Sequence, residues 1–253
     1  MFLQARLEKK FPEFALDVAL TAGQGEFVTI LGPSGSGKTT ALMLLAGLLE
    51  PDRGIIRIDG KDISGLPPEK RGFGVVFQEK LLFPHLSVFE NAAFGLRVRN
   101  LSVQPAWRAL DTVGIRHLAH RNVSSLSGGE RQRAAIARAI AFGPRLLLLD
   151  EPLKELDAAV REKIKVELKR LQHSLGITTV YVTHDVEEAF FLSDKIVILH
   201  AGKSVQTGRP LAVFRHPRNR AVRDYFSPYG LVKIGGKQIL LKKSAVNGVP
   251  GGF

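Results

Sequence analysis

The chain has 253 residues, 45% of them hydrophobic and 24% charged, which suits one large α/β domain, or one domain plus a small appendage. It contains no cysteine, which excludes disulfides and thiolate metal sites. No apolar run approaches the roughly 18 residues that cross a bilayer, and no signal peptide is expected. The net charge of +12 suits a nucleic acid, an anionic membrane surface or a nucleotide site, and its even spread leaves all three open.

The first 60 residues are expected to form short strands around one helix. Residues 3–9 and 14–21 alternate apolar and polar side chains, which predicts two strands. The continuous apolar run at 27–31 predicts a strand covered on both faces. Residues 40–49 are rich in Ala, Leu and Met and predict a helix, and residues 55–58 predict another strand.

Residues 32–39 read Gly-Pro-Ser-Gly-Ser-Gly-Lys-Thr and lie between a predicted strand and a predicted helix, the context in which G-x-x-x-x-G-K-[ST] forms a phosphate loop. Backbone N–H groups surround a polyphosphate only where no Cβ is in the way, and the glycines give this clearance. Lys38 is expected to bridge the β- and γ-phosphates, and Thr39 to ligate Mg²⁺. The alternative is a turn without function. The nucleotide-binding residues expected here are Gly32, Pro33, Ser34, Gly35, Ser36, Gly37, Lys38, Thr39 and Thr40.

The middle of the chain predicts one strand followed by helices. A loop at 65–68 leads to a strand at 73–77, and Ser87-x-x-Glu90 fits a capping box at a helix start. The helices expected are at 87–99, 103–113, 116–121 and 127–142.

The four leucines at 146–149 predict a fully buried strand that ends in Asp150-Glu151. Both carboxylates then emerge at the carboxyl edge of the sheet, where α/β proteins bind ligands. We expect Asp150 to hold the Mg²⁺ shell and Glu151 to polarise a water for attack on the γ-phosphate. The alternative is a pair of solvated acids at a strand end.

The remaining elements alternate, which predicts a mostly parallel sheet with helices on both faces and an antiparallel patch formed by the N-terminal strands. Gly235-Gly236 between apolar runs predicts a hairpin, and residues 247–253 are expected to fray. The helices expected are at 157–175, 185–192, 211–215 and 220–226, and the strands at 178–182, 195–199, 232–234 and 239–241.

Leu126-Ser127-Gly128-Gly129-Glu130 is the most specific signal. A capping box explains Ser127 and Glu130 but not two adjacent glycines, which weaken a helix where they stand. Glycines at a helix start let an anion approach the free N–H groups. Because the chain already has one phosphate loop, this second start is expected to serve the nucleotide of another copy.

Five motifs in this order, 32–39, Gln78, 126–130, 149–151 and His184, resemble the nucleotide-binding ATPase subunit of an ATP-binding cassette (ABC) transporter. The resemblance implies an α/β P-loop NTPase fold of the ABC ATPase type over residues 1–226, with an inserted helical subdomain at about 87–142. It also implies ATP and Mg²⁺ as cofactors. Residues 227–253 resemble the stub of a regulatory β-domain.

The resemblance also assigns roles to single residues. It implies that Gln78 contacts Mg²⁺ and the attacking water, and that His184 reaches the γ-phosphate. Ser127, Gly128 and Gly129 would close on the ATP of a second copy. Asp157, retained in the loop after Glu151, is also expected among the nucleotide-binding residues. An adenine-stacking aromatic is expected at Phe11, with Phe14 second, and either could belong to the core.

Residues 78–88 resemble the importer type, which implies contact with integral-membrane permease subunits through about residues 79–90, with Phe83 and Leu86 as apolar contacts. The resemblance further implies a homodimer on the cytoplasmic face of the cell membrane, an indirect extracytoplasmic solute-binding partner and no nucleic acid. The opening residues and the 66–71 loop resemble molybdate and tungstate importers. Sulfate, ferric ion and polyamine importers share most of these features.

One departure concerns Lys154-Glu155, because importers usually carry Ser-Ala there. Large charged residues at this place are expected to slow dimer closure or hydrolysis. Two other classes stay open as alternatives. One is a soluble ABC ATPase acting on nucleic acid or ribosomes, and the other is a nucleotide-binding regulator that does not hydrolyse ATP.

Overall fold

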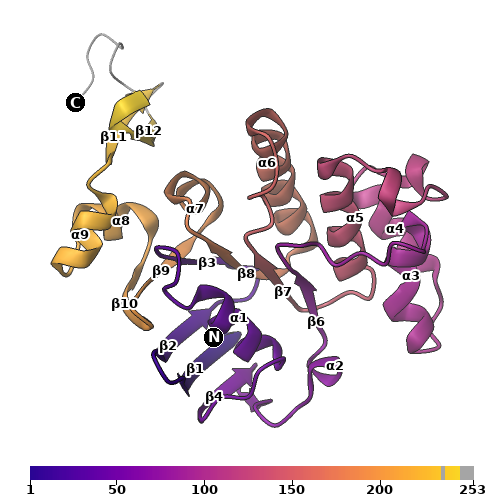
Figure 1. Ribbon diagram of the computed structural model, residues 1–253, viewed down its shortest axis with the longest axis horizontal. Helices are drawn as coiled ribbons and strands as arrows, with labels where there is room; N and C mark the ends of the chain where they lie inside the picture. The colour runs from indigo at the N-terminus through magenta and orange to yellow at the C-terminus, as the bar shows by residue number, and fades with distance from the viewer. Residues whose placement is uncertain (235–236, 246–253) are drawn as a thin grey trace.

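The structure is a computed structural model that describes residues 1–234 and 237–245. Ten strands form one mixed sheet in the order β5-β4-β1-β2-β10-β9-β3-β8-β7-β6, as Figure 1 shows in part. Their bounds are β1 Leu3–Lys10, β2 Ala15–Ala22, β3 Phe27–Leu31, β4 Arg53–Ile58, β5 Lys61–Asp62, β6 Phe73–Val76, β7 Leu146–Asp150, β8 Thr178–Thr183, β9 Lys195–His200 and β10 Lys203–Gly208.

The strands β9, β3, β8, β7 and β6 run parallel to one another. Every residue of β3, β7 and β8 is buried, as continuous apolar runs predict for strands covered on both faces. Parallel strands end at the same edge, so the residues that follow β3, β6, β7 and β8 gather there. The predicted mostly parallel sheet is confirmed.

The predicted antiparallel patch is confirmed, since β1 pairs antiparallel with β2 and β4. The strand β10 was not predicted, because Lys-Ser-Val-Gln-Thr-Gly shows little apolar alternation. It pairs antiparallel with β9 through the two-residue turn Ala201-Gly202, whose φ angles are 45° and 77°. Its one pairing with β2, Lys203 with Asp17, joins the patch to the parallel strands.

The helices cover both faces of the sheet. One apolar cluster joins the helical group α3–α5 and α6 to Leu147 and Leu149 of β7, and a second joins α1 to the N-terminal strands and to Leu146 and Leu148. The helical group lies at one end of the molecule (Figure 1). Helix bounds are α1 Lys38–Ala46, α2 Pro68–Arg71, α3 Val88–Val98, α4 Gln104–Thr112, α5 Gly128–Ile140, α6 Ala158–Leu175, α7 Val186–Leu192, α8 Pro210–Arg215 and α9 Arg220–Phe226.

Several element ends differ from the predictions. Helix α1 ends at Ala46 rather than residue 49, because Gly47 takes a left-handed conformation with φ 80°. The helix predicted at 116–121 is a single 3₁₀ turn, Arg116–Leu118 (η1), and the loop before β6 contains the short α2. A further 3₁₀ turn, Val123–Ser125 (η2), precedes α5.

The C-terminal part packs against α7. The strands β11 (Tyr229–Ile234) and β12 (Lys237–Lys242) pair antiparallel as predicted, followed by the 3₁₀ turn η3 (Lys243–Ala245). The Gly235-Gly236 turn and the fraying predicted at 247–253 lie outside the described residues. Among the described residues, no helix combines the length and apolar character needed to span a bilayer.

Candidate functional site

The phosphate loop has the backbone that its glycines predict. Gly35 and Gly37 are left-handed, with φ 77° and 96°. A Cβ on Gly37 would lie 2.6 Å from Phe14 Cζ, and one on Gly32 would lie 2.1 Å from the Leu199 carbonyl oxygen. A Cβ on Gly35 would meet nothing within 4 Å. Gly32 and Gly37 are therefore required by packing, whereas Gly35 borders open space beside the start of α1.

Lys38 folds back over this loop. Its Nζ donates a hydrogen bond to the Pro33 carbonyl oxygen at 2.9 Å. Burial lowers the pKa of Lys38 below its usual value, and the carboxylates of Glu151 and Asp150 partly oppose that shift. A buried ammonium beside free backbone N–H groups is a site for an anion, which would replace the single carbonyl contact with stronger charge-assisted hydrogen bonds.

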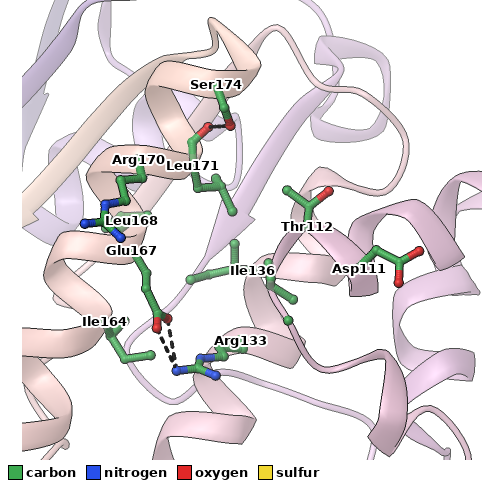
Figure 2. A pocket seen from close by; sticks show the side chains of 12 residues that line it. Asp111, Thr112, Arg133, Ile136, Ile164, Glu167, Leu168, Arg170, Leu171 and Ser174 are labelled. Carbon is green, nitrogen blue, oxygen red and sulfur yellow. Dashed lines mark hydrogen bonds and ion pairs between the residues drawn. The ribbon is translucent and has the colours of Figure 1, made fainter.

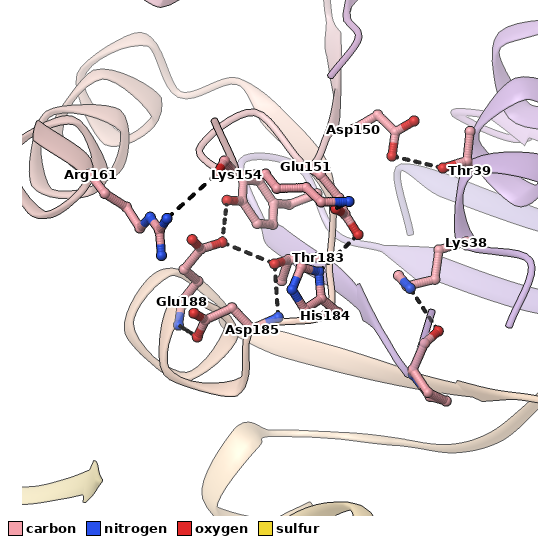
Figure 3. A network of polar contacts seen from close by, with 12 residues as sticks. Lys38, Thr39, Asp150, Glu151, Lys154, Arg161, Thr183, His184, Asp185 and Glu188 are labelled. Atoms are coloured by element: carbon pink, nitrogen blue, oxygen red, sulfur yellow. Dashed lines mark hydrogen bonds and ion pairs between the residues drawn. The ribbon is translucent and has the colours of Figure 1, made fainter. Parts of the chain in front are cut away.

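Asp150, the last residue of β7, is buried and accepts a hydrogen bond from Thr39 Oγ1 at 3.1 Å (Figure 3). Burial raises the pKa of Asp150 despite this hydrogen bond. Hard oxygen donors of this kind fit Mg²⁺. In the described part of the chain no three His, Cys, Asp or Glu residues gather as a metal cluster. The two oxygens of Thr39 and Asp150 suit an ion that takes most of its other ligands from phosphate and water, as Mg²⁺ does with nucleotides.

Glu151 follows β7 with φ 41°, a left-handed conformation that costs a non-glycine residue about 1–3 kcal/mol. Its Oε1 lies 3.0 Å from His184 Nδ1, and its Oε2 lies 2.7 Å from Lys154 Nζ as an ion pair without regular hydrogen-bond geometry (Figure 3). Burial would raise the pKa of Glu151, but Lys154 and His184 outweigh burial and lower it. The structure therefore brings Glu151 and His184 together and adds Lys154.

A buried polar network, which the sequence interpretation missed, supports the segment around His184. Tyr181 and Thr183 of β8 donate hydrogen bonds to Glu188 Oε2 at 2.7 and 3.0 Å. Asp185 caps α7 and donates its N–H to Thr183 Oγ1 at 3.0 Å, as Figure 3 shows for the labelled residues. Burial raises the pKa of Glu188. The signal available in the sequence was a Glu at the third position of a helix that follows a buried strand.

Gln78 lies just beyond β6, which pairs parallel with β7, so it reaches the same edge as Asp150. The two aromatic candidates differ. Phe14 is partly buried in the core and lies against Gly37, whereas Phe11 is 38% exposed with its ring centroid 6.1 Å from that of Phe14. Phe11 is thus the one whose ring is more available to a ligand.

Ser127, Gly128 and Gly129 lie apart from this edge. Ser127 forms the predicted capping box with Glu130 at the start of α5, and α5 packs with α3, α4 and α6 (Figure 1). No hydrogen bond or ion pair of the described residues joins these three to the phosphate loop. A Cβ on Gly129 would lie 2.9 Å from Val160 Cγ1, so this glycine also serves packing against α6. Asp157 caps α6 by accepting the Val160 N–H at 3.0 Å.

The buried side chain of Asn91 makes hydrogen bonds with the backbone of the segment 79–90. The sequence interpretation did not single out this residue. Asn91 accepts the Phe83 N–H at 2.8 Å and donates to the Phe83 and Ser87 carbonyl oxygens at 3.2 and 3.0 Å. Phe83 is partly buried and packs on Phe94 with ring centroids 4.3 Å apart. Leu81, at 52% exposure, is the large apolar side chain most open on this segment.

A cavity of about 390 Å³ lies elsewhere, between α4, α5 and α6 (Figure 2). Ile136, Ile164 and Leu171 line it, and an ion pair joins Arg133 to Glu167 at 3.0 Å. None of the predicted site residues borders this cavity, which is a seam between the helical group and α6. The phosphate loop, the Asp150-Glu151 pair and His184 lie instead at the open carboxyl edge of the sheet.

A phosphate loop, a strand-end Asp-Glu pair and a facing His on one sheet edge define a nucleotide-binding P-loop protein. The chain belongs to the ABC transporter family, whose family model, described as ABC transporter, matches residues 16–154. Among curated relatives, it is 51% identical over 213 residues to the spermidine/putrescine import ATP-binding protein PotA of Bacteroides thetaiotaomicron, covering 83% of this chain and 46% of that protein.

The sulfate/thiosulfate import ATP-binding protein CysA 2 of Chromobacterium violaceum is 50% identical over 222 residues, covering 86% of this chain and 61% of that protein. The chain therefore spans about half to three fifths of these relatives. Among solved structures, CbiO1 of Clostridium perfringens, part of an ABC transporter complex, is similar with TM-score 0.76, 29% identity and coverage of 85% of this chain and 90% of that one. A dimeric bacterial ABC transporter cassette has TM-score 0.70, 32% identity and coverage of 82% and 98%.

Proposed function

We propose that this chain is the ATP-hydrolysing subunit of an ABC importer. The observation that carries this proposal is the juxtaposition of the phosphate loop with Glu151 and His184 at one sheet edge. The family match and the import ATP-binding relatives support it. ATP is the proposed substrate, and a structure with TM-score 0.70 to this chain is a cassette bound to ADP and phosphate after hydrolysis.

In the proposed mechanism, backbone N–H groups within residues 34–40 and Lys38 Nζ bind the phosphates, and Lys38 leaves the Pro33 carbonyl to do so. Glu151 orients the attacking water and takes its proton, while His184 contacts the γ-phosphate. Thr39, Asp150 and Gln78 would hold Mg²⁺, which neutralises phosphate charge when bound. Phe11 is proposed to stack on the adenine, because its ring is the more exposed of the two candidates.

We further propose that two copies sandwich ATP. Ser127, Gly128 and Gly129 present a helix start, and no phosphate-binding group among the described residues of the same chain contacts it. Paired with the phosphate loop of a second copy, this start would add N–H groups on the open side of the nucleotide. The dimeric state of a structurally similar cassette supports this arrangement.

The proposed partners are integral-membrane permease subunits that contact residues 79–90, with Leu81 added to Phe83 and Leu86 as an apolar contact. This places the chain at the cytoplasmic face of the membrane, with an extracytoplasmic solute-binding protein as an indirect partner. For the solute, we propose a polyamine or an oxyanion such as sulfate, which the names of the relatives support. The expectation of molybdate or tungstate has no such support.

For domain organisation, we propose an ATPase domain over residues 1–226 with its helical subdomain at about 87–142. The part from residue 227 is proposed to be an appended β element, a stub of a regulatory β-domain. Its support is the hairpin β11–β12, which contacts α7 through Leu240 and through the Lys242 N–H, 3.3 Å from Glu187 Oε1.

The variant Glu151→Gln tests the function. We expect phosphate release from ATP to fall about 100-fold or more, because the general base is lost. ATP binding should stay within about threefold, because the substitution removes a charge but leaves the phosphate loop intact. Phosphate release and nucleotide titration measure the two effects.

The control is Glu50→Gln, which changes an exposed carboxylate outside the site and should leave turnover unchanged. Turnover that persists in Glu151→Gln, or an unmodified chain that binds ATP without ever releasing phosphate, contradicts the proposal. The second result would favour a non-hydrolytic nucleotide-binding regulator.

A further inference from the structure

The two unusual residues after the proposed catalytic carboxylate form two ion pairs in different directions. Lys154 Nζ lies 2.7 Å from Glu151 Oε2, and Glu155 Oε2 lies 2.5 Å from Lys80 Nζ. One short loop therefore contacts both Glu151 and the segment 79–90. A Ser-Ala pair at these positions, as importers usually carry, has no charge with which to make either ion pair.

The residues of this loop are joined to one another through shared contacts with α6. Leu153 and Leu156 are buried and pack with Ile164 of α6. Arg161 donates to the Leu156 and Lys154 carbonyl oxygens at 3.0 and 3.4 Å. A loop fixed by buried leucines and by its carbonyls moves as a unit, so a displacement of Glu155 is also a displacement of Lys154.

Lys80, the residue that pairs with Glu155, carries a buried positive charge. The Lys80 side chain is 8% exposed and its backbone is left-handed, with φ 62°. Arg138 donates to the Lys80 and Leu81 carbonyl oxygens at 2.9 and 2.6 Å, so the residue is held from two sides. Within the described residues, Glu155 makes the only ion pair of Lys80. A buried ammonium needs a counter-charge. The Glu155 carboxylate is therefore expected to stay paired with Lys80 when Lys80 moves.

We propose that Lys154, Glu155 and Lys80 are positioning residues that together couple Glu151 to the segment 79–90. In the state described, the Lys80–Glu155 pair keeps the loop in place and Lys154 occupies the carboxylate oxygen that would otherwise be free to orient water. Movement of the segment 79–90 draws Glu155 with it, withdraws Lys154 and frees Glu151. The inference rests on the proposed function, because it assigns regulation to the same carboxylate.

The test measures basal ATP turnover of the full chain. We expect Glu155→Gln and Lys154→Met each to raise kcat by roughly threefold or more, while KM for ATP stays within about twofold, because neither side chain is assigned to the nucleotide. Combining the two changes should give no more than Lys154→Met alone, since Glu155 acts through Lys154. Lys154→Arg keeps the charge and should retain the unmodified kcat.

The matched control is Glu162→Gln. Glu162 pairs with Lys165 at 2.6 Å, and Lys165 is 8% exposed like Lys80, but this pair lies on α6 away from Glu151. Thermal unfolding of both Gln variants should shift alike, whereas only Glu155→Gln changes kcat. An unchanged or lower kcat in both Glu155→Gln and Lys154→Met, with turnover still abolished by Glu151→Gln, overturns this inference and leaves the proposed function standing. Absence of turnover in the unmodified chain overturns the function itself.

Discussion

Two helices of this molecule start at glycine-rich segments, and they differ in whether a side chain caps their first N–H groups. Helix α1 begins after Gly37 with no side-chain cap and no acidic residue in its first turn. Helix α5 begins after Ser127, with a complete capping box and Glu130 in its first turn. The uncapped start leaves its donors and partial positive charge to a ligand, whereas the capped start is stable alone and offers fewer donors. We therefore expect the first start to hold phosphate by itself and the second only to add to a site formed elsewhere.

The largest effect should follow from Lys38→Ala, which removes the ammonium from the uncapped start. We expect the Kd for ATP to rise by roughly 100-fold or more, because hydrogen bonds to charged groups contribute about 1.5–3 kcal/mol each. Nucleotide titration measures it. Thermal stability should hardly fall, since the hydrogen bond to Pro33 is lost while the desolvation of a buried ammonium is relieved. Near-normal ATP affinity in Lys38→Ala would contradict the expectation that the start of α1 holds phosphate by itself.

An intermediate effect should follow from Gly128→Asp at the capped start. A Cβ there meets only Leu156 Cδ2 at 3.4 Å, and a carboxylate in the first turn favours the helix, so folding should be kept. The same charge would face the phosphates of a second copy. We expect ATP turnover to fall about 10-fold or more while single chains bind ATP as before.

Gly128 is a better position for this test than Gly129, where a side chain would collide with Val160 and mix packing with function. Turnover is followed as a function of chain concentration, and binding by titration in dilute solution. Full turnover in Gly128→Asp, at concentrations where the unmodified chain dimerises, would show that α5 contributes nothing to the active site.

The smallest effect should follow from Phe11→Ala. Loss of one exposed stacking ring should weaken ATP binding by about threefold to 10-fold, with little change in thermal stability. Phe14→Ala is the matched comparison, because Phe14 packs in the core against Gly37 and should lower the melting temperature. If Phe14→Ala weakens binding in a chain of normal stability while Phe11→Ala does nothing, the two roles are exchanged.

Much of the fold could be predicted because its signals are local. The buried runs at 27–31 and 146–149 indicate central strands, and parallel strands place Lys38, Asp150 and His184 at one edge without any further information. Both predicted capping boxes are present for the same reason, since each lies within four residues. The hydrogen bond between Thr39 and Asp150 follows from that shared edge.

Contacts between distant segments could not be predicted in this way. Lys80 and Glu155 are 75 residues apart, and each alone has the pattern of an ordinary exposed charge. The strand β10 was missed because its side chains are polar, although two consecutive left-handed residues at Ala201-Gly202 form a hairpin turn for which the Gly was a signal. Burial of Tyr181 and Glu188 likewise depends on which helix covers β8.

Near its C-terminal end, helix α5 contacts the segment 79–90 through Arg138. Arg138 lies ten residues after Gly128, which is about 15 Å along the axis at 1.5 Å per residue. The helix therefore carries the start proposed to face the nucleotide of a second copy and, about three turns later, a guanidinium that donates to the carbonyl oxygens of Lys80 and Leu81. If the proposed function holds, a tilt of α5 at the interface with a second copy would also displace the Lys80–Leu81 backbone, so α5 would transmit motion between the second copy and the permease subunit.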